Sequence, residues 1–281
     1  MSRLDILFTG KGTSGSWQCR GVQLGGAVGR VKLGASLKEC KKADIIVVVK
    51  RINAPFFANV IKSGTPWIWD LVDFYPQPSC SAWSRRYAIE WVKKQIAIAK
   101  PNGIIWPNWR MKEDCQMDGA VIYHHARQAP INPVRHEIKT IGYDGSVKFL
   151  GKWRKLLERE CGRRGWRFAE RAPLHSVDII AAFRDDPHNG YVQSHWKSNV
   201  KLANAHGTGT PFIGQPESSY LETATGHERW VTDKDSLSDA LDMLTPYNKR
   251  LQVHQDFIAN TFFIEPRAEQ VRKYAEVLRY R

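Results

Sequence analysis

Short apolar runs and longer stretches with helical spacing alternate along the whole chain. In the first half, the apolar runs predict strands at 4–9, 45–50, 66–70, 103–106 and 120–123. The intervening stretches predict helices near 19–28, 54–63, 80–99 and 109–116. This alternation is typical of an α/β fold with parallel strands.

A segment rich in proline and asparagine, 126–137, interrupts the alternation. Pro130 and Pro133 lack backbone donors and disfavour helix, which indicates a linker between domains. Beyond it, strands are predicted at 139–143, 166–168, 177–183, 211–214 and 230–232, and helices near 147–164, 198–207, 235–244 and from 247 to the C-terminus. We expect two Rossmann-like domains, 1–132 and 133–262, facing a cleft in which ligands bind.

Composition narrows the classes of protein further. The longest apolar run, 45–49, is far shorter than the ~20 residues of a membrane span, and the N-terminal segment lacks the pattern of a signal peptide. The 5 cysteines have no metal-ligand spacing. We expect a cytoplasmic protein with free thiols and no metal. The formal net charge of +14 predicts an anionic partner, for which nucleic acid, anionic lipid and acidic glycan all qualify.

A glycine-rich loop follows the first predicted strand. Gly10, Gly12 and Gly15 have the spacing G-x-G-x-x-G, and Ser14 lies among them. A dinucleotide site also needs an acidic residue about 20 positions later, where this chain has Ala35. A nicotinamide-dependent oxidoreductase is therefore disfavoured. The loop is either a flexible turn or a contact for a phosphate or sugar.

The segment 181–222 carries the most specific pattern. Arg184 follows a predicted strand, and Ser198 is placed to cap a helix whose start is flanked by Lys197 and Lys201. A helix N-terminus with two lysines favours a diphosphate, although a solvated helix face is the alternative. Carboxylates that can accept from ribose hydroxyls follow in a loop, at Glu217 and Glu222.

This order of parts resembles the donor-binding domain of GT-B glycosyltransferases. The family pattern appears as Lys201-Leu-Ala-Asn-Ala205, then Gly209-Thr-Pro211, the strand Phe212-Ile-Gly214 and the acidic loop. The resemblance implies a GT-B fold, a nucleoside-diphosphate sugar such as UDP-glucose as co-substrate, no metal, and a C-terminal helix over 263–281 that crosses back to the first domain. It implies that the donor is held by Gly12, Ser14, Gly15, Arg184, Lys197, Ser198, Asn199, Lys201, Glu217 and Glu222. The two glutamates lie closer together than in many members, which leaves their roles open.

Glycosyl transfer also needs a group that takes the proton of the acceptor. Asp70 ends a predicted strand, Asp73 follows three residues later, and His124 lies at another strand end. The segment 65–78 is similar to one in bacteriophage DNA glucosyltransferases, whose aspartate is the base. Either aspartate or His124 is the candidate here.

The charge and the 11 tryptophans suit a polyanionic, stackable acceptor. Duplex DNA with a hydroxymethylated base fits, held by Arg20, Arg85, Arg86 and Lys93 in the cytoplasm of a bacterial host if the chain is phage-encoded. The alternatives are a transferase acting on a lipid-linked or cell-surface glycan and a basic DNA-binding protein without catalysis.

Overall fold

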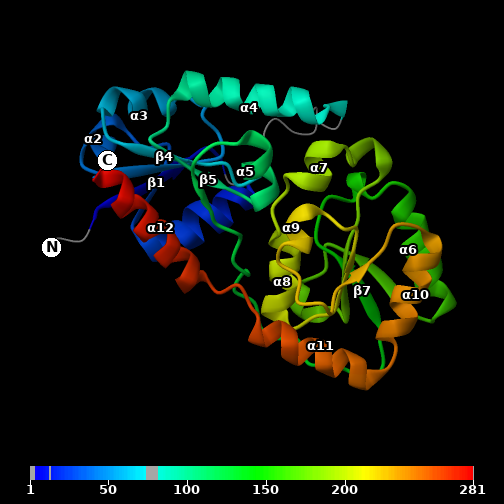
Figure 1. Cartoon of the computed structure of the whole chain (residues 1–281). Coiled ribbons are helices and arrows are strands. Elements are labelled where there is room, and N and C mark those ends of the chain that lie inside the picture. Colours follow the sequence, from blue (N-terminus) through cyan, green and yellow to red (C-terminus); the bar gives the residue numbers. More distant parts are fainter. Residues whose placement is uncertain (1–3, 13, 74–81, 281) are drawn as a thin grey trace.

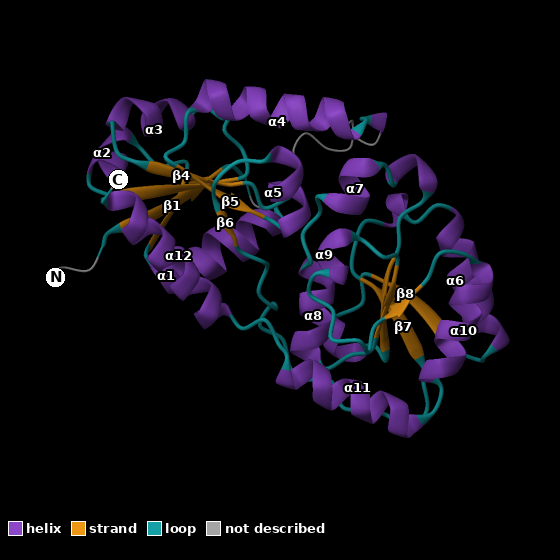
Figure 2. Cartoon of the chain, in the orientation of Figure 1, coloured by secondary structure: helices purple, strands orange, loops and turns teal. Residues whose placement is uncertain are grey.

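The computed structural model describes residues 4–12, 14–73 and 82–280, which form two α/β domains (Figure 1). Each domain is built on one sheet whose strands all run parallel, with helices packed on its faces (Figure 2). The two sheets are separate: one buried cluster surrounds the second sheet, and two further clusters lie on the two faces of the first. The expectation of an α/β chain with two parallel sheets is confirmed.

The first sheet has the strand order β2-β1-β3-β4-β5-β6. Its strands are β1 (Ile6–Gly10), β2 (Arg30–Leu33), β3 (Ile45–Val49), β4 (Trp67–Asp70), β5 (Gly103–Trp106) and β6 (Ala120–Val121). The β3 sequence IIVVV is buried at every position, as expected for a central parallel strand covered on both faces. Gly10 pairs with Val49 and Val49 with Asp70, so the carboxyl ends of β1, β3 and β4 are aligned.

Helices cover both faces of this sheet because strands are added toward one edge from β1 to β2 and toward the opposite edge from β2 onward. One face carries η1 (Trp17–Leu24), a π-helical segment, with α1 (Gly25–Val28) and α12 (Ile264–Arg279). The other carries α2 (Leu37–Lys41), α3 (Phe57–Ser63), α4 (Arg85–Ala99) and α5 (Trp109–Cys115). Right-handed crossovers place helices on opposite faces wherever the direction of strand addition reverses.

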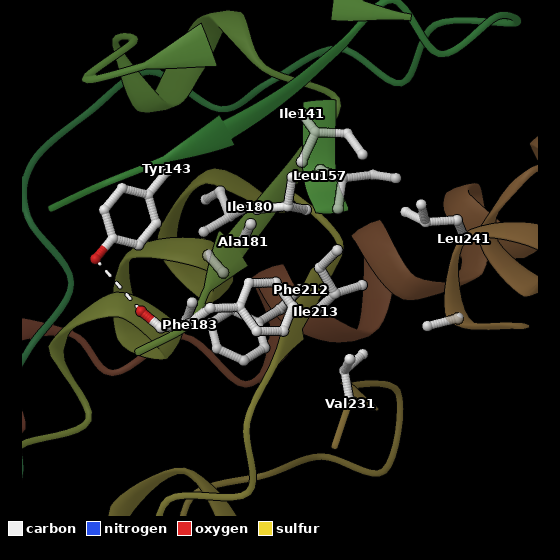
Figure 3. Close-up of a cluster of buried hydrophobic side chains, with 14 of the residues drawn as sticks. Ile141, Tyr143, Leu157, Ile180, Ala181, Phe183, Phe212, Ile213, Val231 and Leu241 are labelled. Atoms are coloured by element: carbon white, nitrogen blue, oxygen red, sulfur yellow. Dashed lines mark hydrogen bonds between the residues drawn. The ribbon is translucent and has the colours of Figure 1, made fainter. Parts of the chain in front are cut away.

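The second sheet has the order β11-β10-β9-β7-β8. Its strands are β7 (Thr140–Tyr143), β8 (Arg167–Glu170), β9 (Ile179–Ala182), β10 (Phe212–Gly214) and β11 (Arg229–Trp230). Around it lie α6 (Lys152–Arg163), α7 (Tyr191–His195), α8 (Val200–Thr208), α9 (Ser218–Leu221), α10 (Lys234–Leu244) and α11 (Tyr247–Ala259), with short 3₁₀ turns at Val147–Phe149, Leu174–Ser176 and Asp186–His188. Figure 3 shows the core between this sheet and its helices, where Phe212, Ile180 and Leu241 are buried.

Two segments of the chain cross between the domains. Helix α12 follows α11 of the second domain and inserts Ala268, Val271 and Ala275 into the core of the first, as the path of the chain in Figure 1 shows. Trp196, just after α7, is fully buried in the other core of the first domain, and its Nε1 donates to Asp114 at 2.8 Å. These contacts fix residues 191–197 of the second domain against the first.

Three elements differ from the expectations. Strand β2 was missed because an edge strand with the sequence RVKL is only partly buried and shows no apolar run. Helix α2 was missed although Ser36 and Glu39 form a capping box, a recognisable helix start. Helix α7 has five residues and depends on tertiary contacts. No helix within the described ranges has the length and apolar character needed to cross a membrane.

Candidate functional site

Each sheet has one position at which the direction of strand addition reverses. In the first sheet it lies between β1 and β3, and in the second between β7 and β9. Loops diverge to opposite faces at such a position and leave a crevice outside the strand ends, where open α/β sheets bind ligands. The residues following these four strands are the glycine loop, Lys50, Asp144 and the segment beginning at Phe183.

Three cations of the second domain gather at its crevice. Arg184 follows β9, and its Nε donates to the Glu217 carboxylate at 2.9 Å. Lys197 precedes α8 and is 8% exposed. Lys201 lies in the first turn of α8, with its Nζ 4.4 Å from the centre of the Tyr143 ring. Arg184 and Lys197 both lower the pKa of Lys201, which shows that the three charges interact.

Burial decides the electrostatics of this cluster. Desolvation, with the nearby Arg184, lowers the pKa of Lys201 from 10.5 to about 7, against the opposing effect of Glu217 and Asp144. Desolvation also lowers the pKa of Lys197. Burial opposes the charge on Arg184 too, but Glu217 outweighs it and raises the pKa of Arg184. Buried basic groups with perturbed pKa values that gather in a crevice are candidates for a functional site.

Asp73 of the first domain is shared by two lysines. Its carboxylate contacts Lys50 of the first domain and lies 3.0 Å from Lys197 Nζ of the second. Burial alone would raise the pKa of Asp73, but Lys197 and Lys50 outweigh it and hold that pKa well below its usual value. Asp73 is therefore ionised at neutral pH and lies next to the cation cluster.

The first candidate base, Asp70, has a structural environment. It is fully buried and makes a bidentate pair with Arg20, at 2.8 Å and 3.1 Å. Arg20 is itself 1% exposed and also donates to the backbone oxygens of Ile122 and Tyr123. An acceptor cannot reach this carboxylate, which argues against Asp70 as a base. Arg20 is inaccessible to nucleic acid, so that prediction is wrong.

The second candidate base, His124, is also deeply buried. It follows β6, is 3% exposed, and neither ring nitrogen has a hydrogen-bond partner among the described residues. Burial first, and then Arg20, lower the pKa of His124 well below 6.5, while Asp73 raises it. The imidazole is therefore neutral and can accept a proton. Its neighbour His125 is hydrogen-bonded to Gln23 at 3.0 Å.

The glycine loop borders the second domain. A side chain on Gly10 would meet the ring of Trp17 at 2.7 Å, so this glycine lets the tryptophan pack on the strand end. Gly12 has a φ of +78°, which favours glycine, and Gly15 lies beneath Arg127. Gly12, Ser14 and Gly15 are all exposed. Arg127 pairs with Asp144 at the end of β7, which places the loop beside the second crevice.

Two assignments around α8 need correction. The helix begins at Val200 with Asn199, not Ser198, in the capping position, and the Asn199 side-chain oxygen accepts from the His124 backbone N–H at 2.9 Å. Glu222 does not face the cations. Its carboxylate accepts from the N–H groups of Trp109 and Arg110 at the start of α5, and from Tyr123. It joins the domains and caps a helix, so the prediction that it binds the donor is not supported.

The remaining predicted residues, Arg85, Arg86 and Lys93, lie on α4. Arg86 is 89% exposed at its side chain and pairs with Glu90, and Lys93 is exposed. Arg85 pairs with Asp114 at 2.9 Å, which ties it to the domain interface. In the described part of the chain no group of three or more His, Cys, Asp or Glu side chains is placed to hold a metal ion.

Comparison with known proteins identifies the architecture. No protein-family model matches the chain, and no curated protein matches it. HepE of Anabaena, in a structure with UDP and glucose, superposes with a TM-score of 0.67 at 11% identity, over 98% of this chain and 100% of that one. AviGT4, a glycosyltransferase involved in avilamycin A biosynthesis, gives 0.59 at 13% identity, over 99% and 98%. The lipopolysaccharide outer core galactosyltransferase WaaB gives 0.57 at 11% identity, over 98% and 99%.

The chain has the fold of the GT-B glycosyltransferases. The similarity extends over both domains, so the two-domain arrangement is common to this chain and these structures. Nothing in the comparisons connects the chain with the bacteriophage DNA glucosyltransferases.

Proposed function

We propose that this GT-B protein is a glycosyltransferase that moves a sugar from a nucleoside-diphosphate sugar to a hydroxyl acceptor. The observation that carries the proposal is the gathering of Arg184, Lys197 and Lys201 at one crevice of the second sheet, opposite Asp73. The structures of HepE were obtained with UDP, with UDP and glucose and with UDP-glucose, which makes UDP-glucose the first donor to test.

The cation cluster suits the leaving group. In the transfer, a bond forms between the acceptor oxygen and the anomeric carbon, and the bond from that carbon to the diphosphate breaks with its electron pair leaving on the diphosphate. Lys197, Lys201 and Arg184 can neutralise this developing charge. The backbone N–H groups at the start of α8 can donate hydrogen bonds to the same oxygens. We propose that these groups stabilise the diphosphate without a metal ion.

Glu217 is proposed to orient the donor sugar or ribose. One of its carboxylate oxygens accepts from Arg184, while the other is buried with no hydrogen-bond partner among the described residues. Burying an unpaired carboxylate oxygen is costly, and a hydroxyl of the ligand would satisfy it. Gly12, Ser14 and Gly15 are proposed to contact the same ligand, which the pairing of the neighbouring Arg127 with Asp144 supports.

Asp73 and His124 are the two candidates for the group that takes the acceptor proton. Asp73 is ionised and His124 neutral, so each has an unprotonated atom for the proton, and the lowered pKa makes each a weak base until its surroundings change. Asp73→Asn and His124→Gln separate them. The variant that removes the base should reduce turnover by about 100-fold while leaving donor affinity measurable, and the other variant should retain turnover.

For the acceptor we propose hydroxymethylated duplex DNA, with a glycan as the second candidate. Residues 1–132 carry 19 Lys and Arg against 9 Asp and Glu, which favours a polyanion. Trp83, just before α4, packs against Tyr87 and Trp91 at ring-centre distances of 4.7 and 5.7 Å, and the same helix carries Arg86, so it bears both aromatic rings and cations. The similarity to WaaB favours a glycan instead.

The test is incubation of the protein with a panel of sugar nucleotides and each acceptor class, followed by mass analysis. We expect release of the nucleoside diphosphate together with a hexose mass gain on the modified nucleoside. A mass gain on a glycan alone would exclude the DNA acceptor. If no sugar nucleotide or nucleoside diphosphate binds, the proposed function is wrong.

A further inference from the structure

Lys50 lies where the direction of strand addition in the first sheet reverses. It follows β3 directly, next to the glycine loop that follows β1. Its side chain is 16% exposed and contacts the Asp73 carboxylate. Lys50, Asp73 and Lys197 thus form a bridge from the first domain to the second, which we call the Lys50–Asp73–Lys197 bridge.

The backbone around this bridge is strained. Lys50 and Val72 both have a φ of 63°, in the left-handed region that residues other than glycine rarely adopt. The Lys50 N–H donates to the Asp70 oxygen at 2.7 Å, and the Val72 N–H donates to the Asp70 carboxylate at 3.2 Å. Two neighbouring strand ends therefore hold unfavourable conformations at the residues that aim Lys50 and Asp73, which is characteristic of a functional site.

The position of Lys197 is set independently of the bridge. The Asn108 side chain donates to the backbone oxygens of His195 and Lys197 at 2.8 and 2.9 Å, and Trp196 between them is buried in the first-domain core. A change of partner at Lys197 therefore requires movement of its side chain alone. The Lys197 amine lies 3.0 Å from the Asp73 carboxylate, and Arg184 is near enough to lower the pKa of Lys197.

Resting on the proposed function, we propose that Asp73 holds the place of the donor diphosphate on Lys197, and that Lys50 is a positioning residue that retains Asp73 when the diphosphate takes Lys197. The donor and Asp73 then compete for one amine. Once Lys197 has moved to the diphosphate, Asp73 is neutralised by one lysine instead of two and becomes a better proton acceptor. Donor binding would thus prepare the carboxylate before the acceptor reacts.

A double-mutant cycle on ligand affinity tests this competition. The probes are UDP and inorganic pyrophosphate, measured by calorimetry on the full chain. Asp73→Asn should tighten the binding of both by about fivefold or more, because Lys197 no longer has a competing carboxylate. In the Lys197→Met background the same change should alter affinity by less than about twofold.

Lys50 has its own arm of the test. Lys50→Met should weaken the binding of both probes by about threefold or more, because Asp73 then depends more strongly on Lys197. This loss should disappear in the Asp73→Asn background, and Lys50→Arg should restore most of the wild-type affinity. A merely structural role for Lys50 would persist without Asp73. Thermal melting of each variant verifies that the protein remains folded.

The outcomes separate the two proposals. If Asp73→Asn tightens binding equally with and without Lys197, the effect is long-range electrostatics and the competition is refuted. If Asp73→Asn leaves affinity unchanged or weakens it, the competition is also refuted, while UDP binding by the wild type would still support the transferase. If pyrophosphate follows the predicted cycle but no nucleoside diphosphate binds, the bridge stands and the proposed donor fails.

Discussion

The two domains divide the positive charge in different ways. Residues 1–132 hold 19 Lys and Arg against 9 Asp and Glu, whereas residues 133–262 hold 18 against 16. Yet the second, nearly neutral domain supplies Arg184, Lys197 and Lys201 to the crevice, whereas the first supplies Lys50 and Arg127. Net charge and site charge are therefore separate properties of this chain.

The physical reason is desolvation. A lysine on an exposed helix such as α4 is solvated and screened, so it acts only together with many others on a large polyanion. A buried lysine interacts strongly with a single ligand group because water does not compete. Under the proposed function, the exposed cations of the first domain would therefore act on a macromolecular acceptor, and the buried cations of the second domain on a small anion. Each of the following predictions tests one side of this difference.

The largest effect is expected at the buried pair of Arg20 and Asp70. Asp70→Asn should lower the free energy of unfolding by about 3–5 kcal/mol, because it leaves the guanidinium buried without a counter-charge. Urea denaturation measures this. Asp5→Asn, which breaks the exposed pair with Arg30, is the control and should cost about 0–1 kcal/mol. Equal losses in the two variants would show that burial does not distinguish these pairs.

Lys201→Ala should weaken UDP binding by about 30-fold or more while leaving the fold intact, because a desolvated cation would no longer meet the diphosphate. Calorimetric titration measures the affinity. Lys155→Ala, on the exposed face of α6, is the matched control and should bind UDP as the wild type does. Unchanged affinity in Lys201→Ala would remove this lysine from the site.

The pH dependence of the same lysine gives a smaller effect. With a pKa of about 7 in the folded protein and 10.5 ordinarily, Lys201 is largely neutral at pH 8, and an anion should restore its proton. Binding of UDP at pH 8 should take up close to one proton, read from calorimetry in buffers of different ionisation enthalpy, and almost none at pH 5.5. Uptake that persists in Lys201→Ala would contradict the assignment.

The sign for stability follows from the same pKa values. Because the folded state holds fewer protons than the unfolded state between about pH 7 and 10.5, this lysine makes stability rise with pH in that window. Its destabilising effect is fully present below pH 7. Denaturation midpoints of Lys201→Met should lose this slope relative to the wild type.

The smallest effect on the donor is expected from the exposed cations. Arg86→Gln with Lys93→Gln should leave UDP affinity unchanged and reduce the slope of DNA affinity against salt by up to about two. Filter binding over a salt series measures this. If the wild type shows no salt-dependent DNA binding, the DNA acceptor fails and the glycan remains.

Much of the architecture was accessible without coordinates. The strands IIVVV and WIWD and the amphipathic stretch of α4 are local patterns, and each predicts its element from side chains within a few residues. The segment 181–222 likewise predicts a diphosphate site from cations placed around one helix start, and that site stays a prediction. Strand β2 and helix α7 are not predicted by local patterns, because β2 is stabilised by pairing with β1, and α7 by the burial of Trp196 in a distant core.

Roles within the site depended on contacts between residues far apart in the chain. Asp70 and Asp73 are indistinguishable by local pattern, but Arg20 closes off the first and Lys50 and Lys197 share the second. Glu222 and Glu217 differ only in whether the nearest partner is a helix start of the other domain or Arg184. Local periodicity encodes the elements because it acts over a few residues, whereas burial and charge pairing arise only after distant segments pack, and it is these that decide which carboxylate or lysine can meet a ligand.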